Sequence, residues 1–308
     1  MRDESNISAS AGDKVRGIVQ HLLPHRLLTW LMYRLTRVRF ALWKNPQIRW
    51  FIGRYGVDVA EAANPDPTSY AHFNAFFTRE LRAGCRPLEG DDETIACPAD
   101  GRLSAIGTIR SGMVFQAKGR DYSVGSLLGG DDAAGVFDGG AFATIYLSPR
   151  DYHRVHMPIE GRLRETRYIP GRLFSVSFST ARTVDRLFAR NERLVCLFDT
   201  PAGPMALILV GAMLVAGMET VWSGPVTPPH GQPLRTEHFD DSGAELRRGQ
   251  EMGRFNTGST VILLFPGNRV RWSDDLHAGS SVRMGQGIGR VRAADAGAIE
   301  RGESAAEG

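Results

Sequence analysis

The chain has 308 residues, of which 42% are hydrophobic and 23% charged, and its 37 Lys and Arg against 34 Asp and Glu leave a formal net charge of +3. This composition is that of a globular protein with one large or two smaller domains, and it excludes a disordered chain, a collagen-like repeat and a polytopic membrane protein. The near-neutral total also gives no reason to expect a nucleic-acid partner.

The cysteines and the N-terminus indicate the compartment. Cys85, Cys97 and Cys196 are odd in number and form no C-x-x-C pair, which predicts neither a disulfide framework nor a bound metal. Residues 1–13 are polar and lack the charged start and apolar run of a secretory signal. We therefore expect a reducing, cytoplasmic environment.

A basic, amphipathic segment comes next, because residues 14–57 contain nine basic residues and no acidic one. Helical spacing of apolar residues predicts one helix over 27–43, with a cationic face opposite the apolar stripe. The stripe consists of Leu31, Leu35, Val38 and Leu42, the cationic face of Arg26, Arg37 and Lys44, and tryptophans stand at 30, 43 and 50. This pattern indicates a helix lying in the headgroup region of an anionic membrane. A helix packed on the domain with a solvated basic face, or an RNA-binding arm, are the alternatives.

The body of the chain, from about residue 95, is predicted to be mainly β-structure. Short apolar runs at 142–147, 194–198, 205–215 and 260–265 are separated by Gly, Pro, Asp and Asn turns. We expect an α+β, mostly β fold, with a β-sandwich or partly closed barrel as core and an α-helical, membrane-associating N-terminal region.

The predicted organisation is a membrane-associating region at 1–65, a catalytic β-rich domain at 66–290 and a disordered tail at 291–308. Helical patterns outside the N-terminal third are confined to 181–191. The uncharged stretch at 200–218 is long enough to span a membrane, but five Gly and Pro residues interrupt it. It is better explained as two buried strands joined near Gly211.

Two segments carry groups that suit proton transfer. The turn at 97–101 holds Asp100 directly before a glycine, an arrangement that is commonly structural. The run at 146–158 holds His153 and His156, whose imidazoles titrate near neutrality. From the residues alone, these histidines are as well explained by a structural role as by a catalytic one.

A third segment, Gly258-Ser259, stands at the start of an apolar run. The hydroxyl of Ser259 can reach the carbonyl of Gly258 through a five-membered ring, and glycine admits backbone conformations that other residues resist. The alternative is the polar beginning of a strand.

Further motifs occur with these in one order along the chain: Phe76-Phe77-Thr78-Arg79 with Arg86-Pro87, Pro98-Ala99-Asp100-Gly101, Tyr146-Leu147-Ser148-Pro149-Arg150-Asp151-Tyr152-His153-Arg154-Val155-His156-Met157-Pro158, Pro170-Gly171-Arg172-Leu173-Phe174-Ser175-Val176, Asn191-Glu192-Arg193 and Gly258-Ser259-Thr260. Over residues 70–282 the chain thereby resembles the phosphatidylserine decarboxylase proenzyme family. Thr257 stands where the family usually has Leu, which would affect the rate of cleavage and not the identity of the nucleophile.

The resemblance implies an enzyme that makes its own cofactor. Ser259 would attack the Gly258 carbonyl, and elimination would leave a β chain of residues 1–258 and an α chain of 259–308 capped by a pyruvoyl group derived from Ser259. By the same resemblance, His156 is the base and Asp100 its orienting carboxylate in a self-cleavage triad with Ser259. His153 is implied as an acid/base of the decarboxylation.

The implied reaction converts phosphatidylserine to phosphatidylethanolamine and CO₂ in phospholipid biosynthesis, through a Schiff base on the pyruvoyl group. Pyridoxal phosphate would be the rival electron sink and requires a lysine, but outside the N-terminal segment only Lys118 exists, with no phosphate-binding loop beside it. That scarcity favours the pyruvoyl group independently of the resemblance. Arg150 and Arg154 are candidates for holding the substrate's anionic groups by charge and position alone.

Two other functions stay open at this point. A lipid-directed serine hydrolase could use Ser259, His156 and Asp100 without self-cleavage, although Ser259 lacks the Gly-x-Ser-x-Gly setting. A non-enzymatic lipid-binding β-domain would use the basic helix but would leave the histidine run unexplained. We expect a peripheral protein at the cytoplasmic face of a bacterial membrane, an α/β heterodimer that could dimerise further.

Overall fold

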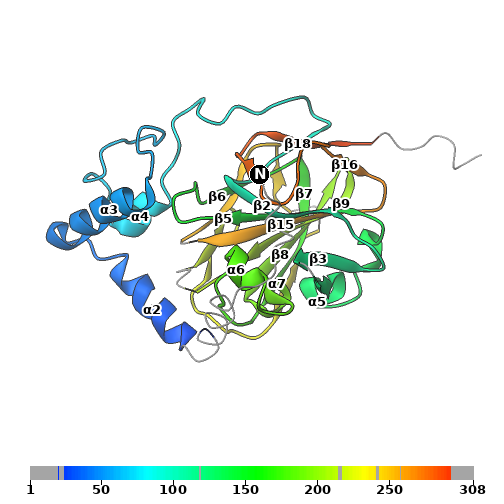
Figure 1. The fold of residues 1–308 in the computed structure, drawn as a ribbon, viewed down its shortest axis with the longest axis horizontal. Helices are drawn as coiled ribbons and strands as arrows, with labels where there is room; N and C mark the ends of the chain where they lie inside the picture. The colour runs from blue at the N-terminus through cyan, green and yellow to red at the C-terminus, as the bar shows by residue number, and fades with distance from the viewer. Residues whose placement is uncertain are drawn as a thin grey trace, which may run out of the picture.

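The computed structural model describes residues 20, 24–117, 119–213, 217–240, 243–256 and 258–292. Lys118, Thr257 and the predicted tail beyond residue 292 lie outside the described residues. The helices of the N-terminal region stand at one side of a body built from β-sheets (Figure 1).

The described part of the N-terminal region contains two long helices and a short one: α2 (His25–Leu35), α3 (Ala41–Tyr55) and α4 (Phe73–Phe77). The predicted single helix over 27–43 is therefore wrong. In a continuous helix the Thr36 carbonyl would accept from the amide of residue 40, but here it accepts from the Asn74 amide at 2.9 Å. The chain is then extended at Phe40, which caps the start of α3. The predicted apolar stripe is divided between the two helices.

The β body is organised around an antiparallel nine-stranded sheet. Its strand order is β12-β7-β8-β9-β15-β5-β2-β17, and β13 also pairs with β7. Their bounds are β2 (Gly101–Thr108), β5 (Ala141–Leu147), β7 (Gly161–Ile169), β8 (Arg193–Thr200), β9 (Gly203–Val210), β12 (Arg235–His238), β13 (Glu245–Leu246), β15 (Ser259–Phe265) and β17 (Ser281–Val282). The strands predicted at 142–147, 194–198 and 260–265 are confirmed as β5, β8 and β15, and β15 is buried over its whole length because β5 and β9 flank it.

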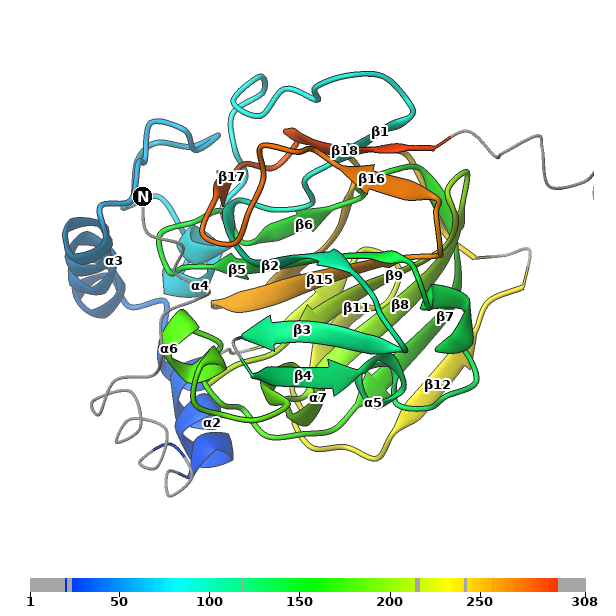
Figure 2. The ribbon, with the colours of Figure 1, turned by 45° about the vertical axis from the view of Figure 1, so that its right-hand side comes forward.

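Three smaller sheets complete the body, and none closes it into a barrel, so the barrel alternative is wrong and sandwich-like layering fits (Figure 2). They comprise β1 (Thr94–Ala96), β18 (Gly287–Val291) and β16 (Val270–Trp272); β11 (Gly224–Thr227), β10 (Met218–Thr220), β14 (Glu251–Phe255) and β6 (Arg154–His156); and β3 (Met113–Ala117) with β4 (Arg120–Ser123). Short helices α5 (Val124–Leu128), η2 (Gly135–Phe137), α6 (Phe178–Ala181) and α7 (Leu187–Arg190) connect strands. The helical pattern at 181–191 is thus realised only in part.

The uncharged stretch at 200–218 forms β9, and after a gap in the described residues the chain continues as β10, which starts at Met218. The first predicted strand is confirmed, while the second begins only at the end of the stretch. Within the described ranges, none of the helices has the length and apolar character needed to span a bilayer.

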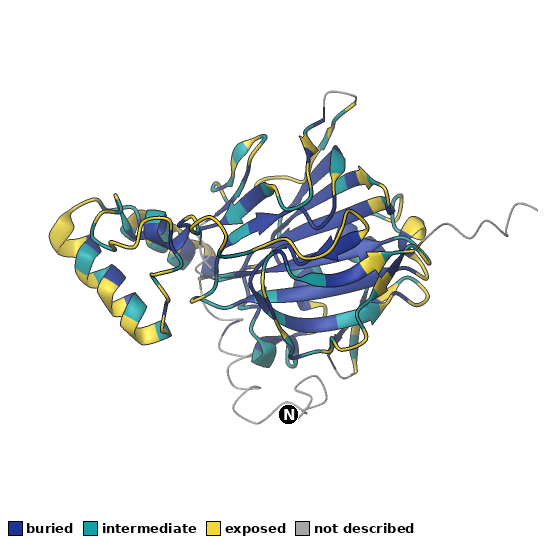
Figure 3. Ribbon diagram, turned by 90° about the horizontal axis from the view of Figure 1, so that it is seen from above, coloured by how far each residue is buried: buried dark blue, intermediate teal, exposed yellow. Residues whose placement is uncertain are grey.

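Among the described residues, buried apolar side chains form two clusters. The larger fills the β body, whereas a smaller one of Ile48, Phe51, Val57, Phe73, Phe76 and Phe77 joins α3 to α4. Figure 3 shows the contrast between the buried strands and the largely exposed surface of the helices. The small cluster takes residues from both sides of the predicted boundary at 65/66, and that boundary stays a prediction.

Candidate active site

Ser259 is the first residue of the central strand β15 and lies opposite Leu147 of β5. Its side chain is fully buried, and its Oγ has no hydrogen-bond partner among the described residues. An unpaired buried hydroxyl costs free energy, so a structural serine would ordinarily be bonded. The hydroxyl is thereby left available for chemistry.

His153 lies against the bond between Gly258 and Ser259. A Cβ built on Gly258 would be 3.9 Å from His153 Nε2 and 3.6 Å from the Leu147 carbonyl oxygen, which are ordinary contacts, so neither neighbour excludes a larger residue than glycine. The ring of His153 is fully buried and packs on Phe77 of α4, with 4.2 Å between ring centroids.

The tautomer of His153 follows from its hydrogen bond. Its Nδ1 lies 2.7 Å from the Asp151 carbonyl oxygen, and since a carbonyl only accepts, Nδ1 carries the proton. Burial lowers the pKa of His153 to about 3, and the Arg79 charge acts in the same direction. The ring is therefore neutral near pH 7, with the Nε2 lone pair unpaired and buried at the Gly258 side.

His156 lies on β6 and is bonded through both ring nitrogens. Nδ1 donates to the Gly249 carbonyl oxygen at 2.8 Å, so Nε2 accepts from the Tyr152 hydroxyl at 3.0 Å. Burial lowers the pKa of His156, while the charges of Glu251 and Asp100 oppose that shift. The ring is a neutral base whose lone pair is already occupied.

Asp100 is nearly buried in the turn before β2, and its carboxylate is bound by Arg86 at 2.6 Å and by the Met284 amide at 2.8 Å. Arg86 also bridges to Glu61 at 2.7 Å. Asp100 is near enough to His156 to influence its pKa, yet within the described part of the chain its hydrogen bonds go elsewhere.

The structure thus brings Gly258, Ser259 and His153 together, and no hydrogen bond among the described residues links Asp100, His156 and Ser259 into a chain. Sequence reasoning did not single out Asp151, whose carbonyl fixes the tautomer of His153 and whose carboxylate accepts from Ser148 N at 2.7 Å. The available signal for Asp151 in the sequence was its place in the 146–158 run, two residues before His153.

An apolar cavity of about 390 Å³ opens beside the Gly258–Ser259 bond. Residues of α2, α3 and α4 form one wall, and the end of β5, residues 175–176 and 212–213, and Gly258 form the other. The lining includes Met32, Trp50, Phe51, Tyr55, Phe77, Leu147, Pro149, Met213 and Gly258. Its size is within the usual range of ligand cavities, and its lining suits hydrocarbon.

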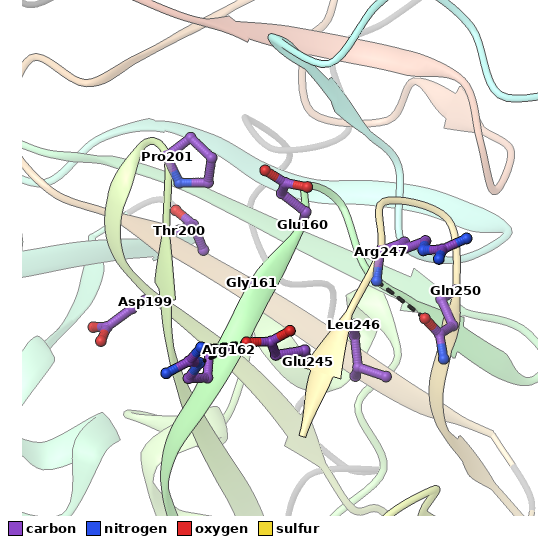
Figure 4. A pocket seen from close by; sticks show the side chains of 10 residues that line it. All are labelled: Glu160, Gly161, Arg162, Asp199, Thr200, Pro201, Glu245, Leu246, Arg247 and Gln250. Carbon is purple, nitrogen blue, oxygen red and sulfur yellow. Dashed lines mark hydrogen bonds and ion pairs between the residues drawn. The ribbon is translucent and has the colours of Figure 1, made fainter. Parts of the chain in front are cut away.

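A larger cavity of about 950 Å³ is lined by the start of β7, the turn between β8 and β9, and β13 with the turn that follows it (Figure 4). Within it, Arg162 pairs with Glu245, and the Arg247 amide donates to Gln250 Oε1 at 3.0 Å. It contains none of the predicted site residues. The apolar cavity is the better candidate for a substrate site because it reaches the reactive bond.

Comparison with known proteins decides the family. A sequence model described as phosphatidylserine decarboxylase matches residues 73–290, and a second, described as PSD, matches residues 16–56. The chain belongs to the phosphatidylserine decarboxylase family. The resemblance seen in the motifs is thereby confirmed over most of the chain.

Individual relatives of the family agree. The phosphatidylserine decarboxylase proenzyme of Pseudomonas fluorescens is 56% identical over 276 residues, which cover 88% of this chain and 96% of the relative. The proenzymes of Stutzerimonas stutzeri and Azotobacter vinelandii are 52% and 54% identical, over 94% and 91% of this chain. Their names describe an enzyme made as a precursor, which supports a self-processing decarboxylase and not the alternative serine hydrolase.

Proposed function

We propose that the chain cleaves itself between Gly258 and Ser259 and then decarboxylates phosphatidylserine to phosphatidylethanolamine. The observation that carries this proposal is the buried, unbonded Ser259 hydroxyl in a chain of this family. Ser259 follows Gly258, which lines an apolar cavity and lies near a histidine with a free lone pair. A lipid substrate and an internal nucleophile are both accounted for by that arrangement.

Cleavage begins when the Ser259 Oγ loses its proton to a base and attacks the Gly258 carbonyl carbon. The C–N bond breaks, the nitrogen takes up a proton, and an ester with a free amine results. Loss of the Ser259 Hα then expels the Gly258 carboxylate and leaves a dehydroalanine, which tautomerises and is hydrolysed with loss of ammonia. The product is a pyruvoyl group at the start of β15.

We assign the base of cleavage to His156, with Asp100 behind it, as the family correspondence implies. Both are buried, and the Asp100 charge favours the protonated form of His156 that proton uptake would create. For this role, His156 Nε2 must exchange the Tyr152 hydroxyl for that of Ser259, which is a side-chain rearrangement.

His153 is assigned to the decarboxylation, because Ser259 becomes the reactive group and His153 Nε2 lies beside Gly258, the residue directly before it. Because the ring is neutral near pH 7, its lone pair can accept a proton, and the protonated ring can deliver it to the carbon that loses CO₂. Full burial of His153 and the Phe77 ring packed on it exclude water from this transfer.

The residues fit a pyruvoyl group at position 259. The side chain there is small, buried and unbonded, and the adjoining cavity gives access to a substrate amine. When present, the group supplies an electron sink for the pair left by the departing CO₂. The rival cofactor, pyridoxal phosphate, would need a lysine, and the described residues offer Lys44 of α3. The Nζ of Lys44 donates to Asn45 Oδ1 and to the Thr68 carbonyl oxygen, at 2.7 Å each.

We further propose that α2 and α3 rest on an anionic membrane. Seven large apolar side chains on and between these helices are exposed, namely Leu27, Trp30, Leu31, Phe40, Leu42, Trp43 and Trp50, and arginines alternate with them. This exposed apolar surface adjoins the apolar cavity through Trp50, so a lipid could pass from the bilayer to the reactive bond. The enzyme would then be peripheral, at the cytoplasmic face.

The test is to purify the protein and Ser259→Ala and to measure cleavage on denaturing gels and CO₂ release from phosphatidylserine. We expect the wild type to be cleaved and active, and Ser259→Ala to be neither. Ser104→Ala is the matched control, since Ser104 is also a buried strand serine but lies on β2. Decarboxylation by Ser259→Ala would refute the proposal.

A further inference from the structure

A second, polar cavity of about 420 Å³ adjoins the apolar one. The loop at 147–152 separates them, with Leu147 and Pro149 lining the apolar cavity and Ser148, Arg150, Asp151 and Tyr152 lining the polar one. The ends of α3 and α4 divide in the same way: Tyr55 and Phe77 face the apolar cavity, whereas Gly56 and Arg79 face the polar one. The two cavities therefore share a wall beside the reactive bond.

Arg79 is the unusual residue of this polar cavity. It is only 5% exposed, its Nε is buried without a partner, and among the described residues its guanidinium has no hydrogen bond or ion pair. It lies over the Phe76 ring, 5.2 Å from the centroid. Burial lowers the pKa of Arg79, yet a guanidinium stays charged near pH 7.

The other arginines nearby are engaged. In the cavity, Arg86 is hydrogen-bonded to Asp100 and Glu61, and Arg102 to the Gly279 carbonyl. Arg150 and Arg283 are exposed and form looser ion pairs, Arg150 with Asp151 at 3.8 Å and Arg283 with Glu61 at 3.6 Å. Arg154, one of the two candidates from the sequence, donates to the Thr78 carbonyl, Glu80 and Glu251. Glu61 and Asp100 line the same cavity and attract the Arg79 charge, but both are hydrogen-bonded to Arg86, and neither forms an ion pair with Arg79. Since a buried cation without an ion pair is costly, an anion from outside the chain would stabilise Arg79.

We infer that the polar cavity is an anion subsite in which Arg79 binds the phosphodiester of the phospholipid, an inference that rests on the proposed substrate. A phospholipid has its anionic phosphate next to its hydrocarbon, and the two adjoining cavities offer a place for each. Arg79 also lies near His153, close enough for its charge to lower the pKa of that ring. A phosphate at Arg79 would therefore be held within the neighbourhood of the reacting headgroup.

The phosphate is favoured over the carboxylate of the serine headgroup. The carboxylate loses its charge as CO₂ departs, so an ion pair to it would stabilise the substrate more than the transition state and would slow the reaction. The phosphate keeps its charge throughout. Arg79 bound to phosphate would therefore lower KM and leave kcat nearly unchanged.

The experiment compares cleaved wild type with Arg79→Gln and Arg79→Lys on a short-chain, soluble phosphatidylserine. We expect KM to rise about 10- to 100-fold in Arg79→Gln, with kcat within about threefold, and Arg79→Lys to recover part of the loss. Arg164→Gln, a surface substitution on β7 with the same change of charge, should leave both constants unchanged. An unchanged KM in Arg79→Gln, or a loss confined to kcat, overturns the inference.

Two soluble probes distinguish the anions. Glycerophosphocholine carries the phosphodiester without the carboxylate, and N-acetylserine carries the carboxylate without the phosphate. We expect Arg79→Gln to weaken competitive inhibition by glycerophosphocholine about 10-fold or more and to leave inhibition by N-acetylserine unchanged. The reverse pattern would assign Arg79 to the carboxylate and contradict the inference.

Calorimetric binding of glycerophosphocholine to the uncleaved Ser259→Ala chain, with and without Arg79→Gln, gives a readout independent of activity. Weaker binding in the Arg79→Gln chain supports the subsite even if the wild type proves not to decarboxylate phosphatidylserine. Equal binding to both chains refutes it, whatever the reaction. Failure of the subsite and failure of the proposed function are thereby separated.

Discussion

At the scale of single residues, the two histidines of the 146–158 run differ in what their lone pairs meet. His153 Nε2 faces Gly258 without a partner, whereas His156 Nε2 accepts from Tyr152. Their spacing of three residues in the sequence does not reveal this difference, because it depends on which carbonyl each Nδ1 reaches. The assignment of separate roles to them is therefore testable residue by residue.

We predict that His153→Ala still cleaves itself but loses about 10²- to 10⁴-fold in kcat, the usual contribution of a general acid/base. We predict that His156→Ala accumulates as uncleaved precursor. Denaturing gels and CO₂ release measure the two steps separately. An uncleaved His153→Ala alongside a fully cleaved His156→Ala would reverse the assignment and make His153 the base of cleavage.

At the scale of elements, α4 connects the helical region to the cleavage loop. Asn74 Nδ2 donates to the Asn256 carbonyl oxygen at 2.8 Å, and Asn256 is further held by Glu219 at 3.0 Å and by the Gly217 carbonyl at 2.9 Å. These bonds fix the residue two positions before Gly258. The geometry of attack thus depends on packing between elements far apart in the sequence.

We expect Asn74→Ala to slow self-cleavage about 10-fold, because the Asn256 carbonyl loses its buried donor and the loop before Gly258 is less fixed. The time course of precursor loss after refolding measures this rate. Asn64→Ala is the control, since Asn64 bonds only to exposed partners in the loop before α4. Cleavage of Asn74→Ala at the wild-type rate would contradict a positioning role.

The exposed apolar surface of α2 and α3 supplies the second element-scale prediction. Leu42 is 78% exposed and Trp43 45%, and their burial in lipid would contribute to binding. Leu42→Ser with Trp43→Ser should reduce sedimentation with vesicles containing anionic phospholipid about 10-fold or more. Leu234→Ser, at an equally accessible apolar residue before β12, should bind as wild type does. Equal binding by all three proteins would place the contact elsewhere.

The elements that could be predicted from the sequence are those whose residues are buried on every side. Runs of apolar residues marked β5, β8 and β15 because no polar face is needed in the middle of the large sheet. The break between α2 and α3 could not be predicted, since it depends on the Asn74 amide taking the Thr36 carbonyl. Asp100 and Ser259 could be predicted as site residues because they stand in sequence motifs. That Arg79 has no hydrogen-bond partner among the described residues could not be predicted, since it depends on the positions of all the side chains around it.

At the scale of the whole molecule, the β body and the helices have separate apolar clusters, and the apolar cavity lies between them. A site between two clusters can admit a lipid without exposing either core. The buried histidines add a further property of the whole chain, because their proton affinity differs between the folded and unfolded states.

Stability should fall on acidification. His153 has a folded pKa of about 3 against an ordinary 6.5, so the unfolded chain binds its proton more tightly and stability rises with pH between those values. At pH 5 this group lowers the free energy of unfolding by about 2 kcal/mol relative to pH 8. Urea denaturation of Ser259→Ala with and without His153→Gln measures the difference. Equal losses in both chains would contradict a neutral, buried His153.

The central claim is that the 308-residue chain is a precursor, and intact-mass spectrometry of the purified protein tests it most directly. The account predicts two chains that separate between Gly258 and Ser259, the smaller lacking a free amino terminus, and a single full-length chain in Ser259→Ala. A wild-type protein that decarboxylates phosphatidylserine while showing one intact chain of 33.8 kDa would contradict it.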